Sequence, residues 1–185
     1  MSELWATDLL RPYLVGEIMS APVYSARPDE SLRSAGLTMR RQHVSGLPVV
    51  NARGRVVGVL SEKDILEVLN REVGVGHSRG ILDLLLGDYE NEHRGLLLRS
   101  SAALLNTTVA DAMSLPAVTV DSETPLVDAA LLLRKLSINR VPVVRGEKLV
   151  GIITREDVLK VLESDSSVAG SSKERAERQT PLPAH

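Results

Sequence analysis

The chain has 185 residues, of which 43% are hydrophobic and 25% charged, so it fits one or two small globular domains and excludes a large multidomain enzyme or a wholly disordered protein. The formal net charge is −2 and aromatic residues make up 2%, which argues against a general affinity for nucleic acid. The chain has no cysteine, and this excludes disulfides, thiolate catalysis and cysteine-based zinc sites.

The first residues do not have the pattern of a secretion signal. Glu3 and Asp8 stand where a signal peptide is first basic and then apolar. No run approaches the roughly 18 apolar residues that a membrane span requires. We therefore expect a cytoplasmic protein without a membrane segment, and we interpret residues 1–14 as an N-terminal extension.

The chain contains an internal repeat. A shift of 94 positions aligns Val15–Val50 with Val109–Val144, with 11 identities in 36 positions. A shift of 93 positions then aligns Val57–Leu69 with Val150–Leu162, with 6 identities in 13 positions. A repeat of this length is a structural unit that recurs. We therefore divide the chain into repeat 1 (15–69), an insertion (70–108), repeat 2 (109–162) and a tail (163–185).

Each repeat predicts the order strand, helix, strand, strand, helix. The predicted strands are 23–25, 47–50 and 56–60 in repeat 1, and 117–120, 141–144 and 149–153 in repeat 2. Leu32, Ala35 and Met39 recur with the spacing of an amphipathic helix, as do their counterparts in repeat 2. Thr124 followed by Pro125 predicts a helix N-cap with proline at the first helical position. Polar and glycine residues at 51–54 and 145–148 predict hairpin turns.

The insertion and the tail differ in composition. Apolar runs at 81–86 and 96–105 predict two short helices within the insertion, which we interpret as a cover for the repeats, with a lid over a ligand cleft as the alternative. The tail is rich in serine, charged residues and proline, so it is predicted to be disordered.

One motif stands at the same strand-to-helix junction in both repeats. Gly58–Asp64 and Gly151–Asp157 each place a hydroxyl residue three positions before an aspartate. This spacing is typical of a capping box, which satisfies free N–H groups at a helix start. The same junction also suits a phosphate, and its carboxylate suits ribose hydroxyls. Because the motif occurs twice, we favour the ligand-binding interpretation over capping alone.

These residues resemble the tandem cystathionine-β-synthase (CBS) domain pair, or Bateman module. The opening segments of that family are similar to Val15–Ser20 and Val109–Ser114, and its closing pattern of glycine, apolar residue, any residue, Ser/Thr, two residues and Asp is matched in both repeats. The resemblance implies an α/β fold in which two CBS repeats pack as a pseudo-symmetric pair. It also implies adenine nucleotides (AMP, ADP or ATP) or S-adenosylmethionine as regulatory ligands in the clefts between the repeats, with no cofactor required.

The resemblance assigns roles to particular residues. Ser61 and Thr154 would contact phosphate or ribose, while Asp64 and Asp157 would hold the ribose hydroxyls. Repeat 2 is expected to bind phosphate better, because Arg140 stands just before the middle strand where repeat 1 has Gly46. The candidate ligand-binding residues are Thr154, Asp157, Arg140, Arg155, Asn139, Ser61, Asp64 and Lys63. For Arg140 and Arg155 the alternative is an ordinary solvated charge.

The sequence predicts a regulatory module that is not an enzyme, because it shows no nucleophile or acid–base pair of a catalytic site. The four histidines, His43, His77, His93 and His185, lack metal-ligand spacing. Apolar residues on the last helix of each repeat predict a homodimer, and we expect an unidentified protein partner. The alternatives are a ligand-free dimerisation scaffold and, less favoured, a nucleic-acid-binding regulator.

Overall fold

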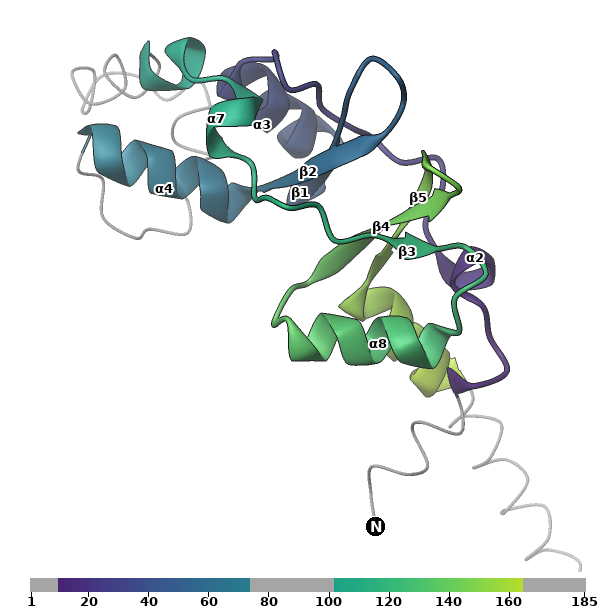
Figure 1. Cartoon of the computed structure of the whole chain (residues 1–185). Helices are drawn as coiled ribbons and strands as arrows, with labels where there is room; N and C mark the ends of the chain where they lie inside the picture. Colours follow the sequence, from purple (N-terminus) through teal and green to yellow (C-terminus); the bar gives the residue numbers. More distant parts are fainter. Residues whose placement is uncertain (1–9, 74–101, 165–185) are drawn as a thin grey trace, which may run out of the picture. The chain divides into compact units, whose positions relative to one another are not determined.

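The computed structural model describes residues 10–73 and 102–164 (Figure 1). The described chain forms two compact units. The repeat-1 unit contains residues 22–119 and 145–149, and the repeat-2 unit contains residues 1–21, 120–144 and 150–185, each within the described ranges. The predicted helix at 81–86 and the predicted disorder of 165–185 lie outside those ranges. Of the predicted helix at 96–105, the described part is helical over 102–106.

The repeat-1 unit is an antiparallel hairpin packed with helices. Its elements are α3 (Leu32–Arg41), β1 (Gly46–Val50), β2 (Val56–Ser61), α4 (Glu62–Val73) and α7 (Val109–Ala112). The strands β1 and β2 pair antiparallel through the predicted turn, where Gly54 has a φ of 80°. Side chains from α3, α4, β1 and α7 meet in one core. The largest fully buried side chains of this core are Leu32, Leu47, Leu60, Ile65, Leu69 and Leu104.

The repeat-2 unit contains a three-stranded sheet. Its elements are α2 (Val15–Ile18), β3 (Val120–Asp121), α8 (Leu126–Lys135), β4 (Arg140–Arg145), β5 (Lys148–Thr154) and a helix over 155–164, except that the last residue of β4 and the first two residues of β5 belong to the repeat-1 unit. The sheet order is β3-β4-β5, and β3 runs parallel to β4. Leu126, Leu133 and Ile153 are fully buried in its core. Together the two units confirm the predicted α/β fold.

Three of the predicted element starts are wrong. The first strands were expected at 23–25 and 117–120, but ladder pairing begins later, at the bridge of Ala26 with Val49 and at β3. The reason is that an apolar run becomes a strand only where its backbone finds a partner, and Ala26 N–H is the group that donates to Pro48 O, at 2.9 Å. Pro125 is itself the N-cap of α8, so Thr124 does not cap that helix.

The opening segment of each repeat packs in the unit that holds the body of the other repeat. Ser114 exchanges two backbone hydrogen bonds with Val59 of β2, at 2.9 and 3.3 Å. In the same way Ser20 exchanges two with Ile152 of β5, at 2.9 and 3.1 Å. The structural units therefore differ from the sequence repeats by an exchange of their opening segments.

A glycine in each final strand makes room for this exchange. A Cβ built on Gly58 would collide with the side chain of Met113, and a Cβ built on Gly151 would collide with that of Met19. Both glycines are buried, and each is the first residue of the closing motif. The glycine of that motif is therefore required by the methionine of the opening motif from the other repeat.

Helices α3 and α8 end in the same way. His43 and Ser137 follow these helices with positive φ values of 52° and 53°. At each end the next residue donates to the carbonyl three residues before the C-cap, as Val44 N–H does to Met39 O at 3.0 Å. This is a Schellman motif, in which the left-handed position is usually glycine.

Glycine at the left-handed positions is expected to stabilise the protein. An L-residue in this conformation costs about 1–2 kcal/mol, part of which the greater chain entropy of glycine offsets. We therefore expect Ser137→Gly and His43→Gly each to raise the free energy of unfolding by about 0.5–1 kcal/mol. Urea denaturation measures the change. Gln42→Gly is the control, because Gln42 has a φ of −97° and glycine there should destabilise.

Candidate functional site

The two strand-to-helix junctions singled out in the sequence have the same hydrogen-bond geometry. In the Thr154 corner, defined as Thr154 and Asp157, Asp157 Oδ2 accepts from Thr154 N–H at 2.8 Å and from the Thr154 hydroxyl at 2.6 Å. In the Ser61 corner, defined as Ser61, Asp64 and Ser114, Asp64 Oδ2 accepts from Ser61 N–H at 2.7 Å and from its hydroxyl at 2.5 Å. The capping interpretation is thereby confirmed for both motifs.

The same box recurs at a third place that carried no ligand prediction. Thr108 N–H and its hydroxyl donate to Asp111 Oδ2 at 3.0 and 2.5 Å at the start of α7. The Thr108 hydroxyl, and then its N–H, lower the pKa of the Asp111 carboxyl. The Oδ2 atom and the hydroxyl hydrogen of such a box are thus occupied by the fold itself. The atom that can separate binding from capping is the second carboxylate oxygen, Oδ1.

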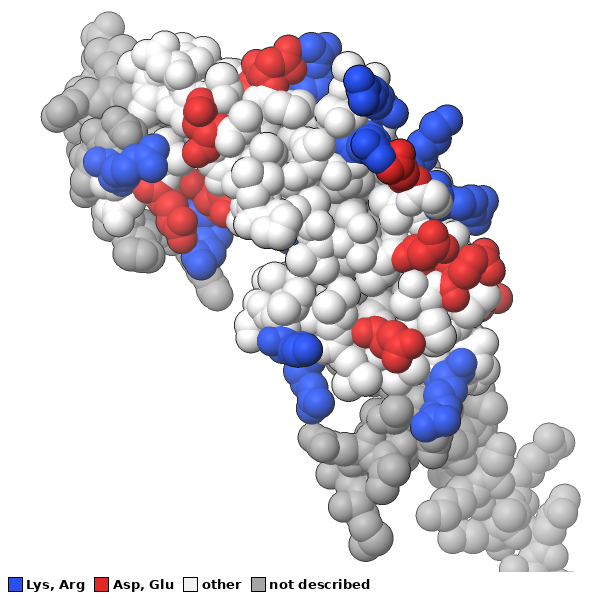
Figure 2. Space-filling model, viewed as in Figure 1, with Lys and Arg blue, Asp and Glu red and all other residues white. Residues whose placement is uncertain are grey.

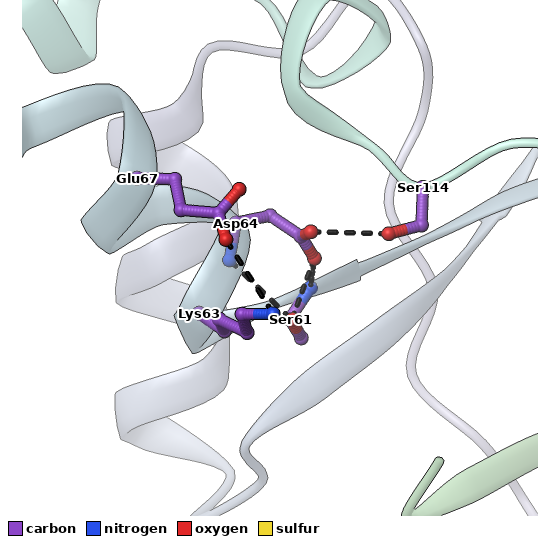
Figure 3. Close-up of polar contacts among 5 residues, drawn as sticks. All are labelled: Ser61, Lys63, Asp64, Glu67 and Ser114. Atoms are coloured by element: carbon purple, nitrogen blue, oxygen red, sulfur yellow. Dashed lines mark hydrogen bonds and ion pairs between the residues drawn. The ribbon is translucent and has the colours of Figure 1, made fainter. Parts of the chain in front are cut away.

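In the Ser61 corner this second oxygen is occupied. The Ser114 hydroxyl donates to Asp64 Oδ1 at 3.1 Å, and Figure 3 shows Asp64 between Ser61 and Ser114. The contact depends on the exchanged opening segment, which brings Ser114 beside β2. Sequence reasoning gave Ser114 no role, although its identity with Ser20 in the repeat alignment was the available signal. Every polar atom of the Asp64 carboxylate is engaged by the repeat-1 unit.

In the Thr154 corner the second oxygen has no such partner. Within residues 10–73 and 102–164, Asp157 accepts only through Oδ2. Ser20 is the counterpart of Ser114 and pairs with β5 through its backbone, but it gives Asp157 no hydrogen bond. Asp157 is half-buried at the start of the helix over 155–164. The two corners therefore differ in one carboxylate oxygen, because Asp64 Oδ1 accepts from Ser114 whereas Asp157 Oδ1 accepts from no described residue.

Arg155 is engaged in the fold of the repeat-2 unit. Its Nε donates to Ile138 O at 2.8 Å and its Nη2 donates to Leu133 O at 3.1 Å. Leu133 lies in the last turn of α8 and Ile138 lies just after the end of that helix, so Arg155 supplies donors to carbonyls at the C-terminal end of α8 and beyond it. Sequence reasoning did not find this role, because the partners lie 22 and 17 positions earlier in the chain. Glu62 occupies the equivalent position in repeat 1 and cannot donate in this way.

Removing the Arg155 contacts is expected to destabilise the protein. Arg155→Lys keeps the charge but cannot reach both carbonyls with one ammonium group. We expect it to lower the free energy of unfolding by about 1–2 kcal/mol, near the value of one hydrogen bond from a charged group. Chemical denaturation measures this loss. Glu62→Gln is the matched control and should stay within about 0.5 kcal/mol of the wild type.

Three candidate residues remain. Asn139 and Arg140 lie at the start of β4, and Lys63 lies in the first turn of α4. Asn139 is exposed, and its carbonyl accepts from Arg155 N–H at 3.1 Å, which fixes the entry to β4. Arg140 is the first residue of β4 and is half-buried. The side chain of Lys63, on α4, is 83% exposed. Its Nζ lies 3.5 Å from Oε1 of Glu67, so the two side chains form a surface ion pair. Such a pair contributes little to stability.

The profile of the CBS domain family matches residues 15–71 and 109–164, which is more than half of the chain. The protein therefore belongs to the CBS domain family and carries two CBS domains in tandem, as the sequence predicted. Among the residues that the structure describes, no group of three or more His, Asp or Glu side chains is placed to hold a metal ion. No described helix has the length and apolar character needed to cross a membrane.

The chain is similar to curated proteins from archaea and plants. The protein MJ1404 of Methanocaldococcus jannaschii is 26% identical over 162 residues, which are 88% of this chain and 35% of MJ1404. The chloroplastic CBS domain-containing protein CBSX1 of Arabidopsis thaliana is 30% identical over 155 residues, which are 80% of this chain and 63% of CBSX1. The chain thus spans about a third of the first relative and less than two thirds of the second.

Solved structures of CBS domains share the fold. The CBS domain of a CBS domain-containing membrane protein from Sphaerobacter thermophilus is 26% identical with a TM-score of 0.66, over 85% of this chain and 92% of that chain. A structure of CBSX2 in complex with AMP is 26% identical with a TM-score of 0.61, and the match covers 82% of this chain and 97% of that chain. The CBS domain pair of MJ0100 in complex with 5-methylthioadenosine and S-adenosylmethionine is 22% identical with a TM-score of 0.62, and the match covers 83% of this chain and 98% of that chain. At this identity the similarity shows the fold alone.

Proposed function

We propose that this protein is a regulatory module that binds an adenine nucleotide or a related adenosyl ligand at the Thr154 corner and signals to a protein partner. The observation that carries the proposal is Asp157 Oδ1, a fixed carboxylate oxygen without a donor among the described residues. Ribose has two neighbouring hydroxyl groups, which can donate hydrogen bonds to this oxygen. The similar protein CBSX2 has been solved with AMP, which supports an adenosine ligand.

The fold prepares this oxygen for binding. Thr154 holds Asp157 through Oδ2, so the carboxylate is oriented before a ligand arrives. Arg140 at the start of β4 supplies a positive charge for phosphate, and Asn139 precedes it. We assign Arg155 a positioning role, because its guanidinium donates to the carbonyls of Leu133 and Ile138. Hydrogen bonds from ribose to the ionised Asp157 carboxylate would be stronger than hydrogen bonds between neutral groups.

We propose a weaker role for the Ser61 corner. The Ser114 hydroxyl occupies Asp64 Oδ1, so a ribose would first have to displace it. Lys63 is the nearest basic residue of this corner along the chain, and it lies on the exposed face of α4 with Glu67 (Figure 3). The difference between the corners predicts one favoured ligand position in each chain.

The action of the module requires an interaction rather than catalysis. We propose that it is not an enzyme and that it forms a homodimer. Leu131 of α8 and Leu159 of the helix over 155–164 leave 46% and 55% of their surface exposed, which supports an apolar contact with another protein. Light scattering that gives the mass of one chain at micromolar concentration would contradict the dimer. A cytoplasmic location stays a prediction.

A thermal-shift screen tests the proposed function. AMP, ADP, ATP, NAD and S-adenosylmethionine are each added to the full chain. A ligand present at 100 times its Kd stabilises the fold by about 2.7 kcal/mol, which raises the melting temperature by several degrees. We expect at least one adenosyl ligand to give such a shift and guanosine monophosphate to give none. A flat result with all five compounds would favour the ligand-free scaffold instead.

A further inference from the structure

A group of basic side chains lies at the turns of two hairpins, apart from the Ser61 corner. The basic patch, defined as Arg53, Arg55, Arg145, Glu147 and Lys148, lines a cavity of about 410 Å³. All five residues belong to the repeat-1 unit. Figure 2 shows Lys and Arg side chains gathered on the face that carries the β1–β2 hairpin, with acidic side chains beside them.

Hydrogen bonds order the backbone that carries these side chains. Asn51 Oδ1 accepts from Arg53 N–H at 2.9 Å and from Arg55 N–H at 3.1 Å. Arg55 is bridged to Lys148 through the backbone and forms an ion pair with Glu147. The backbone of the first turn is thereby fixed to the second turn. The patch is thus built on an ordered scaffold rather than on a free loop.

The patch is a separate place from the Ser61 corner. Arg55 directly precedes β2, and Ser61 ends it. Six residue steps along a strand at about 3.3 Å each separate them by about 20 Å. A mononucleotide held at Asp64 therefore does not reach the basic patch of the same unit.

The charge and the donor type of the patch identify a class of ligand. The described lining holds four cationic side chains and one carboxylate, so its formal charge is +3. Three of the cations are arginines, whose planar guanidinium groups match phosphate oxygens with two parallel hydrogen bonds. Among the residues that the structure describes, none of those lining the cavity is an aromatic residue on which a base could stack. The lining therefore suits a chain of phosphoryl groups better than a nucleobase.

We infer that the basic patch binds a small polyphosphate, a linear anion of two or more phosphoryl groups, independently of the nucleotide at the Thr154 corner. Such an anion carries enough charge to engage the arginines of both hairpins at once. Binding would join the two turns more firmly, because one ligand would contact Arg53 and Lys148 together. The interaction is electrostatic and exposed, so it weakens as salt rises.

Calorimetric titration of inorganic triphosphate into the full chain tests this inference. We expect saturable binding that weakens about tenfold or more in the double variant Arg53→Gln/Lys148→Gln, since two charge-assisted contacts are lost. Arg33→Gln/Arg41→Gln is the matched control, because it removes two exposed cations of α3 and should leave the affinity within twofold. Glu147→Gln is expected to strengthen binding severalfold by removing the one negative charge of the patch.

The other outcomes would overturn the inference. Absence of binding at millimolar triphosphate would do so, as would an equal loss in the control variant. Loss of triphosphate binding in Asp157→Asn would place the anion at the nucleotide site. Equal binding of a glutamate peptide with the same charge would define an acidic-peptide surface, and equal binding of AMP and triphosphate would show one phosphate to be sufficient. Failure of the nucleotide screen, by contrast, leaves the triphosphate result unaffected.

Discussion

Asp157→Asn is expected to weaken AMP binding about 10- to 150-fold, which corresponds to 1.5–3 kcal/mol for hydrogen bonds to a charged group. The asparagine side chain keeps the size of aspartate but replaces one carboxylate oxygen by an amide nitrogen and removes the negative charge. In the Thr154 corner, Oδ2 is held by Thr154, so the atom offered to ribose is Oδ1. Calorimetric titration of AMP into the wild type and the variant measures the change.

Asp64→Asn is the matched control for that change. Both substitutions disturb a capping box of the same geometry, so both should lower the free energy of unfolding by about 0.5–2 kcal/mol. Only Asp157→Asn should lower the affinity for AMP strongly, because Asp64 Oδ1 is already engaged by Ser114. Equal losses of AMP affinity in the two variants would show that the corners do not differ as we propose.

Gly151→Val is expected to destabilise the protein by about 1–3 kcal/mol, the usual range for overpacking a buried position. Gly151 is buried in β5, and any Cβ there meets the side chain of Met19. The double variant Gly151→Val/Met19→Ala should regain about 1 kcal/mol or more relative to the single variant, since alanine frees the space. Urea denaturation of the wild type, of Gly151→Val, of Met19→Ala and of the double variant gives the coupling free energy.

A crossed double variant makes the test specific. In Gly151→Val/Met113→Ala the truncated methionine is the one that packs on Gly58, so no recovery is expected. In the reciprocal double variant, Gly58→Val/Met113→Ala, the alanine should restore stability as Met19→Ala does for Gly151→Val. Recovery in the crossed variant would mean that each opening segment packs on its own repeat, and the exchange described above would be wrong.

The sequence predicted the elements well because local patterns determine them. The spacing of Leu32, Ala35 and Met39 predicted α3, and all three side chains are buried in the core. Gly54 and Gly146 marked the hairpin turns, where they have φ values of 80° and 62°. The corners were predicted because a hydroxyl residue three positions before an aspartate forms its box within one helical turn.

The exchange of opening segments could not be predicted from the repeat alignment. The two copies resemble each other, so Met19 fits Gly58 and Gly151 equally well as far as composition is concerned. Which of them it meets depends on the path of the chain through 22–119, and no local pattern encodes that path. The contact between Ser114 and Asp64 spans 50 residues and follows from the same path.

The basic patch and the role of Arg155 escaped prediction for a similar reason. Arg55 and Glu147 look like unrelated turn residues in the sequence, and only the pairing of Arg55 with Lys148 brings them together. Arg155 was interpreted as a charge for phosphate because it follows Thr154. Its partners are backbone carbonyls, which carry no residue-type signal.

A crystal structure of the full chain grown with saturating AMP tests the central claim most directly. We predict ribose hydroxyls within about 3 Å of Asp157 Oδ1, with Thr154 still bound to Oδ2 and with the Ser114 hydroxyl still on Asp64 Oδ1. An AMP molecule held by Asp64 with Ser114 displaced, or no bound AMP at either corner, would contradict the account.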